Sequence, residues 1–184
     1  AVRPAERWRD LEPTRAEPYL YLGMIYEALG NTEQAVDAYE RWASLLNNDV
    51  EANLSAGEIF HQHQEYERAI ERFERATVLA PERAEAWQGL ARCYYQLESY
   101  ESAAEAYKKA VEINPQDLQS QTQLGWSLYF LERYEDAILA FEKTLEIQPT
   151  SGAYRGLGGS FYSLRNYESA LAAYQEAIAL APGD

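Results

Sequence analysis

Prolines recur in this chain at a nearly constant interval. Pro81, Pro115, Pro149 and Pro182 follow one another at spacings that differ by no more than one position. A fixed period of this kind is the sequence signature of a repeat architecture, in which each repeat is one supersecondary unit stacked on its neighbours. Because proline cannot continue a helix, each of these positions marks the end of a structural element. The period therefore restricts the chain to a stack of similar units.

Aligning the chain on this period gives five units. They span residues 16–49, 50–83, 84–117, 118–150 and 151–184. The eighth position of each unit is a small residue: Gly23, Gly57, Ala91, Gly125 and Gly158. The twenty-fourth position is an aromatic ring: Tyr39, Phe73, Tyr107, Phe141 and Tyr174. Small residues let two helices cross closely, and large rings fill the space that remains between them.

Within a unit, the apolar positions follow helical spacing. Positions 4, 7, 8 and 11 form one helix face, and positions 20, 24, 27 and 28 form a second. The dipeptides Gly30-Asn31 and Arg165-Asn166 fall between the two faces, where one helix stops and the next begins. Asn31 with Gln34 predicts a capping box at the start of a second helix. Strand-like alternation does not extend over a useful length. Each unit is therefore predicted to be an antiparallel helix pair.

These columns resemble the tetratricopeptide repeat family. The third unit is nearest to the family pattern and matches it at Trp87, Leu90, Ala91, Tyr94, Ala103, Tyr107, Ala110 and Pro115. The resemblance covers residues 16–184 and implies an all-α fold, a right-handed superhelical solenoid of antiparallel helix pairs. Residues 1–15 keep the same register, since Pro13 lies one full period before Asn47. We expect them to be the remnant of a preceding helix.

The charge of the chain restricts its partners. It has 30 acidic and 16 basic residues, for a net charge of −14. Nucleic-acid affinity depends on lysines and arginines that displace counterions, so neither nucleic acid nor an anionic membrane is an expected partner. No apolar run approaches the roughly 20 residues of a membrane helix. The single cysteine, Cys93, fits a reducing compartment, and a cytoplasmic location is expected. A removed signal peptide or a larger parent protein stays open.

No catalytic, cofactor or metal site is predicted. Cys93 has no histidine close in register that would act as its base. His61 and His63 are two residues apart, which on a helix turns their rings about 200° away from each other and from a shared metal ion. Position eighteen is glutamate in every unit, in the first turn of a second helix, where its charge offsets the helix dipole. We therefore expect the chain not to be an enzyme and to need no cofactor.

The candidate binding site is a stripe of first-helix residues at positions 2, 5, 9 and 12. Similarity to the family implies that this stripe lines a concave groove in which peptides bind. Its acidic part, in the earlier units, contains Glu51, Glu58, His61 and Glu85. Its aromatic part contains Arg92, Tyr95, Trp126, Tyr129, Arg155 and Tyr162. We expect a partner to bury an apolar or aromatic side chain near Trp126 and to place a carboxylate close to Arg92 or Arg155. The alternative, that the tyrosines only pack between neighbouring repeats, stays open.

The expected function is that of a protein-interaction scaffold, which binds an extended segment or a short helix of another protein in the groove. The clamp with which some family members grip chaperone tails is missing, because its first-unit positions hold Leu20 and Met24. One alternative is an assembly module that forms a homo-oligomer through its terminal helices. Leu171, Tyr174 and Ile178 of the last helix favour it, because no capping helix follows them. A second alternative is the non-catalytic part of a larger multidomain protein.

Overall fold

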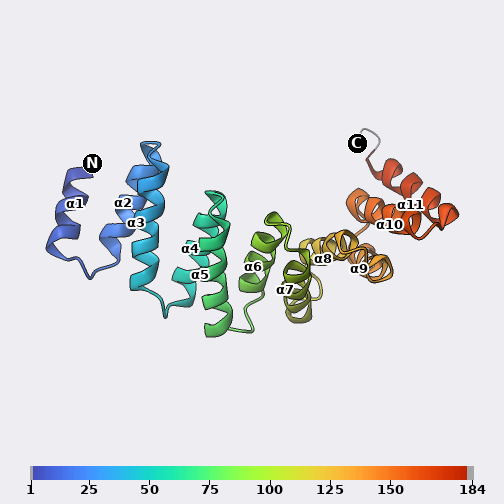
Figure 1. Cartoon of the computed structure of the whole chain (residues 1–184), viewed down its shortest axis with the longest axis horizontal. Coiled ribbons are helices and arrows are strands. Elements are labelled where there is room, and N and C mark those ends of the chain that lie inside the picture. Colours follow the sequence, from blue (N-terminus) through green and yellow to red (C-terminus); the bar gives the residue numbers. More distant parts are fainter. Residues whose placement is uncertain (1, 182–184) are drawn as a thin grey trace. The chain divides into compact units, whose positions relative to one another are not determined.

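The computed structural model describes residues 2–181, and its regular structure over that range is entirely α-helical, as predicted. The helices are α1 (Val2–Leu11), α2 (Glu17–Ala28), α3 (Thr32–Leu45), α4 (Val50–Gln62), α5 (Tyr66–Leu79), α6 (Ala84–Gln96), α7 (Tyr100–Ile113), α8 (Leu118–Phe130), α9 (Tyr134–Ile147), α10 (Ser151–Ser163) and α11 (Tyr167–Leu180) (Figure 1). From α2 onwards they form antiparallel pairs, one in each predicted unit. None of the helices over residues 2–181 is long and apolar enough to cross a membrane.

The chain divides by its internal contacts into two compact units. The N-terminal unit runs to Glu82 and contains α1–α5, and the C-terminal unit starts at Arg83 and contains α6–α11. In the N-terminal unit α1 packs on α2, and α3 packs on α4. In the C-terminal unit α7 packs on α8, and α9 packs on α10, so that three pairs are stacked in sequence. That all five pairs make one superhelical array stays a prediction.

In four of the five pairs, a ring on the second helix packs against a glycine on the first, and the third pair has Ala91 at this position. A Cβ atom added to Gly125 would lie 2.6 Å from the Phe141 ring, and one added to Gly156 of the following pair would lie 2.2 Å from the same ring. The same close approach joins Gly23 to Tyr39, Gly57 to Phe73, and Gly158 to Tyr174. Real Cβ atoms do not come this close, so only glycine lets the helices cross here. The predicted roles of the eighth and twenty-fourth columns are confirmed.

Each pair turns through one residue in the left-handed backbone conformation. Gly30 has this conformation in the first pair, with φ of 75°. The other pairs place a residue with a side chain there: Gln64, Glu98, Glu132 and Arg165, with φ between 57° and 63°. The next N–H then bonds back into the first helix, as from Asn31 to the Tyr26 carbonyl at 2.9 Å. This hydrogen bond recurs in all the pairs and ends every first helix in the same way.

The capping box predicted at Asn31 is wrong. The Asn31 side chain makes no capping hydrogen bond, and its ψ of 70° takes it out of the extended region in which caps usually lie. A side-chain cap instead begins α4, where Asp49 accepts from the N–H of Ala52 at 2.9 Å with extended backbone. Asp117 and Thr150 cap α8 and α10 in the same way.

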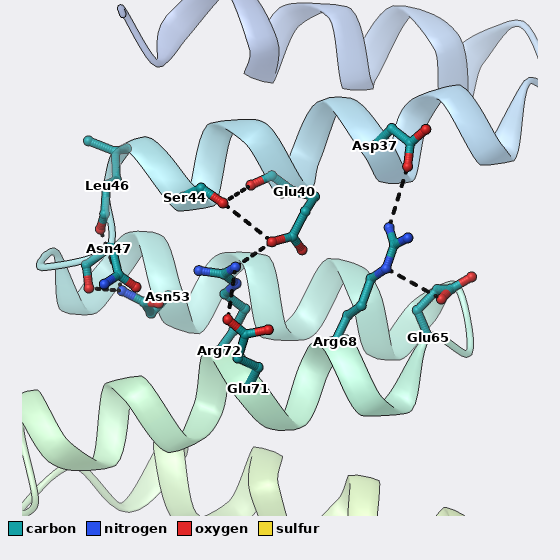
Figure 2. Close-up of polar contacts among 10 residues, drawn as sticks. All are labelled: Asp37, Glu40, Ser44, Leu46, Asn47, Asn53, Glu65, Arg68, Glu71 and Arg72. Atoms are coloured by element: carbon teal, nitrogen blue, oxygen red, sulfur yellow. Dashed lines mark hydrogen bonds and ion pairs between the residues drawn. The ribbon is translucent and has the colours of Figure 1, made fainter.

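Charged side chains join the second helices of the N-terminal unit (Figure 2). Arg72 on α5 is only 3% exposed and donates to the carboxylate of Glu40 on α3. One turn earlier on α5, Arg68 pairs with Asp37 on α3 at 3.6 Å and with Glu65 at 3.8 Å. A buried charge is costly unless it is paired, and the ion pair of Arg72 with Glu40 meets this need while it joins α5 to α3.

Candidate functional site

The predicted stripe residues of the N-terminal unit lie on α4. Glu51 is exposed, whereas Glu58 and His61 are half-buried. The His61 ring meets the Tyr66 ring edge-on, with 5.5 Å between ring centroids. Together these residues give this face of α4 an acidic character.

On α6, the predicted residues differ in what they contact. Glu85 is exposed and accepts a hydrogen bond from Arg83 at 3.2 Å. A hydrogen bond from its own backbone N–H, and to a lesser extent that of Arg83, lowers the pKa of Glu85. Arg92 is half-buried. Tyr95 is also half-buried, and burial, with a smaller contribution from Tyr100, raises the pKa of Tyr95.

An aromatic cluster connects α6 to α8. The Tyr95 ring lies 6.2 Å from Phe130, and Phe130 lies 6.3 Å from Trp126 and 5.7 Å from Tyr129. Trp126 also meets the buried Phe141 ring edge-on at 5.2 Å. Trp126 is therefore anchored in the core on one side and half-buried on the other, which fixes its ring without hiding it.

Three of the predicted residues meet at one pocket in the C-terminal unit, which we call the aromatic pocket. It has a volume of about 580 Å³. The predicted residues are Trp126, Tyr129 and Arg155, and the rest of its wall is Ser151, Gly159, Tyr174, Ala177, Ile178 and Ala181. The walls are mostly apolar, with one arginine that is exposed to solvent. Such a pocket suits an apolar or aromatic side chain next to a negative charge.

Tyr162, the remaining predicted residue, does not line the pocket. Its side chain is 61% exposed, and its ring meets Tyr167 edge-on at 5.6 Å. It lies near Tyr174 in the pocket wall, since burial first, and then Tyr129 and Tyr162, raise the pKa of Tyr174.

The residues of the α11 wall were expected to be uncovered, but they were not predicted to belong to the binding site. Tyr174 belongs to a column that is buried in the earlier pairs, and Ile178 to one that is buried or half-buried there, yet they are 38% and 60% exposed. Phe141, at the same position as Tyr174, is covered by glycines of its own pair and of the next pair. Tyr174 is covered only by Gly158, since no described helix follows α11. The signal in the sequence is that residues of these columns are covered only where a further helix pair follows them.

Comparisons with known proteins identify the repeat. A family model described as tetratricopeptide repeat matches residues 54–117 and 122–184, and a second model of the same description matches residues 19–41. No curated protein sequence matches the chain.

Solved structures with the same fold span nearly all of the chain. A crystal structure of MamA protein has a TM-score of 0.81 at 23% identity, covering 91% of this chain and 92% of that one. YrrB, a TPR protein with an unusual peptide-binding site, has a TM-score of 0.77 at 23% identity, covering 100% and 95%. A further structure, MamA MSR-1, has a TM-score of 0.76 at 26% identity, covering 91% and 97%.

Proposed function

Since the chain belongs to the tetratricopeptide repeat family, we propose that it is a scaffold that binds a segment of a partner protein, with the aromatic pocket as the anchor site. The family builds binding surfaces from stacked helix pairs rather than catalytic centres. The fold that the chain shares with YrrB, which has a peptide-binding site, supports the same class of function here.

The observation that carries this proposal is the convergence of Trp126, Tyr129 and Arg155 on the aromatic pocket. A side chain that enters it leaves water for two aromatic faces and the aliphatic wall of Ile178. An anchor in a desolvated pocket typically contributes about 2 kcal/mol or more to binding. Arg155 then favours a carboxylate beside the anchor, because a guanidinium pairs with two carboxylate oxygens at once.

The acidic residues Glu51, Glu58 and Glu85 favour lysine or arginine elsewhere on the partner. Glu51 and Glu85 are exposed and Glu58 is half-buried. Charges at the rim of an interface act mainly on the association rate and are screened by salt. These glutamates are thus expected to attract the partner, and the pocket to retain it.

The experiment is selection of linear peptides from a phage-displayed library against the intact protein. We expect enrichment of an aromatic or large aliphatic residue next to aspartate or glutamate. Titration of an enriched peptide should show binding at least about thirtyfold weaker for Trp126→Ala, the equivalent of about 2 kcal/mol. Arg155→Gln should weaken binding less, and Arg165→Gln, an exposed arginine outside the pocket, should leave it unchanged.

Because Trp126 also packs on Phe141, each variant is first checked for its helix content and its urea midpoint. Glu58→Gln should mainly flatten the salt dependence of the association rate. Enriched peptides that bind the Trp126→Ala and Arg155→Gln variants as tightly as the original protein would exclude the aromatic pocket as the anchor site.

The exposed face of α11 favours a second candidate function, self-association. Leu171, Tyr174 and Ile178 share one face of this helix and are 61%, 38% and 60% exposed. Apolar side chains that lie together on a surface often mark an interface. Sedimentation should then show concentration-dependent association that Leu171→Asp removes while peptide binding persists. A protein that stays monomeric at all concentrations would exclude this candidate.

A further inference from the structure

A second cavity lies in the C-terminal unit, on the side of the second helices. It is a groove between α7 and α9 with a volume of about 1040 Å³, which we call the α7–α9 groove. Leu124 and Leu128 of α8 lie at its base, together with Ala140 of α9. Its sides carry five carboxylates and three cationic side chains. The groove is therefore apolar inside and acidic at its margins.

The N-terminal unit has arginines in the corresponding place. Two full periods separate α3 from α7 and α5 from α9 in the repeat register. At this offset Arg68 corresponds to Asp136, and Arg72 corresponds to Ala140. Figure 2 shows both arginines reaching from α5 towards carboxylates of α3. The space that Arg72 fills between α3 and α5 is thus left above an alanine between α7 and α9.

The C-terminal unit keeps a carboxylate at the position of Asp37, the partner of Arg68, but has no arginine at the position of Arg68. Asp37, the partner of Arg68, corresponds to Glu105 on α7. Glu105 and Asp136 therefore occupy two positions that an ion pair joins in the N-terminal unit, and both are acidic and exposed. Arg133 donates to Oδ2 of Asp136 at 2.8 Å and lies 3.6 Å from Glu101, so it partly neutralises Asp136, whereas Glu105 lies one turn further along α7. A cation between Glu105 and Asp136 would complete the arrangement.

The apolar part of the α7–α9 groove lies one helical turn after Asp136 on α9. Asp136 and Ala140 are four residues apart, which places them on the same face of α9. Beside Ala140, the exposed side chain of Leu139 replaces Glu71, a carboxylate that Arg72 contacts in the N-terminal unit. An aliphatic side chain over Ala140 would contact Leu139 and the base of the groove. A cation at the same place would be repelled by Lys108.

We propose that the α7–α9 groove binds an amphipathic helix of a partner protein that presents an arginine and an aliphatic residue one helical turn apart. The arginine lies between Glu105 and Asp136, as Arg68 lies beside Asp37, and the aliphatic residue lies over Ala140. A helix of 14 residues, the length of α7 and α9, is about 21 Å long and matches the groove. Helices that bind in grooves are generally held by such side chains at positions i and i+4.

The test uses a phage library of 14-residue helical peptides, with randomised residues on one face, selected against the intact protein. The expected result is enrichment of arginine four residues from leucine or isoleucine. Two variants then place the arginines of the N-terminal unit in the groove. Asp136→Arg and Ala140→Arg should each weaken binding of an enriched peptide about tenfold or more, since like charge and lost space both oppose it.

Glu142→Arg is the matched control, because it makes the same charge change at an exposed position of α9 that does not line the groove. It should change the dissociation constant by no more than about twofold. If Ala140→Arg disturbs the fold, Asp136→Arg at an exposed position still decides the test. Binding unchanged by Asp136→Arg, or enriched peptides without arginine, would overturn the proposal. So would a dimer in sedimentation that Asp136→Arg dissociates, because the occupant would then be a second copy. Trp126→Ala should leave this binding unchanged, which separates it from the aromatic pocket.

Discussion

The two units use the same helix pairs but treat the surface between their second helices in opposite ways. In the N-terminal unit, Arg72 fills the space between α3 and α5 and pairs with Glu40. In the C-terminal unit, Ala140 leaves the corresponding space open, and Lys108 stands in the place of Glu40. The glycine and ring columns that build the pairs are alike in both units. The residues that form the helix pairs are therefore different from those that shape the surface between the second helices. At that surface, Arg72 and Glu40 fill the space in the N-terminal unit, whereas Ala140 and Lys108 leave it open in the C-terminal unit.

The largest effect is expected where the C-terminal unit relies on apolar contact. Phe141 is fully buried and touches glycines of two helix pairs. Phe141→Ala should lower the free energy of unfolding by about 3–5 kcal/mol, because it leaves a cavity that two rigid helices cannot fill. Urea unfolding followed by circular dichroism measures this. Phe130→Ala is the control, since Phe130 is 46% exposed and should cost about 1 kcal/mol or less. A similar loss for both would contradict the expectation.

The next largest effect is expected for the ion pair between Arg72 and Glu40 in the N-terminal unit. Arg72→Ala should lower the free energy of unfolding by about 2–3 kcal/mol, because it removes side-chain contacts and leaves the Glu40 carboxylate without its buried partner. Arg72→Met keeps the aliphatic volume and should cost less, about 1 kcal/mol. Both are measured by urea unfolding. Equal losses for the two variants would mean that charge, not volume, holds α3 and α5 together.

A third experiment introduces the ion pair of the N-terminal unit at the corresponding positions of the C-terminal unit. Ala140→Arg places a cation opposite Lys108, and Lys108→Glu restores the N-terminal pairing. A double-mutant cycle on the free energy of unfolding should give a favourable coupling of about 1 kcal/mol between the two substitutions. A coupling of zero would show that the two grooves differ in backbone shape and not only in side chains.

The smallest effect concerns a turn on which both units agree. Glu98→Gly should raise the free energy of unfolding by up to about 1 kcal/mol, because glycine adopts the left-handed conformation without the cost that a side chain adds. Gly30→Ala should lower it by about 1 kcal/mol for the same reason. Nothing lies within 4 Å of a Cβ at Gly30, so the change tests backbone conformation alone. Thermal or urea unfolding of both variants is the measurement.

The sequence was sufficient to predict the helices and how each pair crosses. Because the sequence is periodic, equivalent positions make equivalent contacts in different pairs. Gly125 packs against Phe141 in the same way as Gly57 packs against Phe73. The Asn31 cap could not be decided from residue type or from backbone conformation, because Asn31 with ψ of 70° makes no capping bond whereas Asn166 with ψ of 74° does. Asn166, at the same place in the last pair, makes a capping bond, but a long one of 3.3 Å.

The candidate site was predictable in part. Trp126, Tyr129 and Arg155 follow from the spacing of one helix face, which brings them to one pocket. Tyr174 was expected to be uncovered but was left out of the site, because it lies on a second helix and the predicted stripe contains first-helix residues only. The α7–α9 groove was missed for a different reason. Its signal lies in variable charged positions, such as Arg72 against Ala140, which lie outside the columns that define the repeat.

The Phe141 ring belongs to two helix pairs at once, which has a consequence for how the C-terminal unit opens. In a stack of repeats, stability is a sum of terms within each repeat and terms between neighbours. Phe141 contributes to both, because Gly125 of its own pair and Gly156 of the next pair both lie against the ring. When α10 and α11 separate from the stack, water reaches a ring that α8 alone cannot cover. Amides of α8 to α11 should therefore exchange with solvent in one shared event rather than pair by pair.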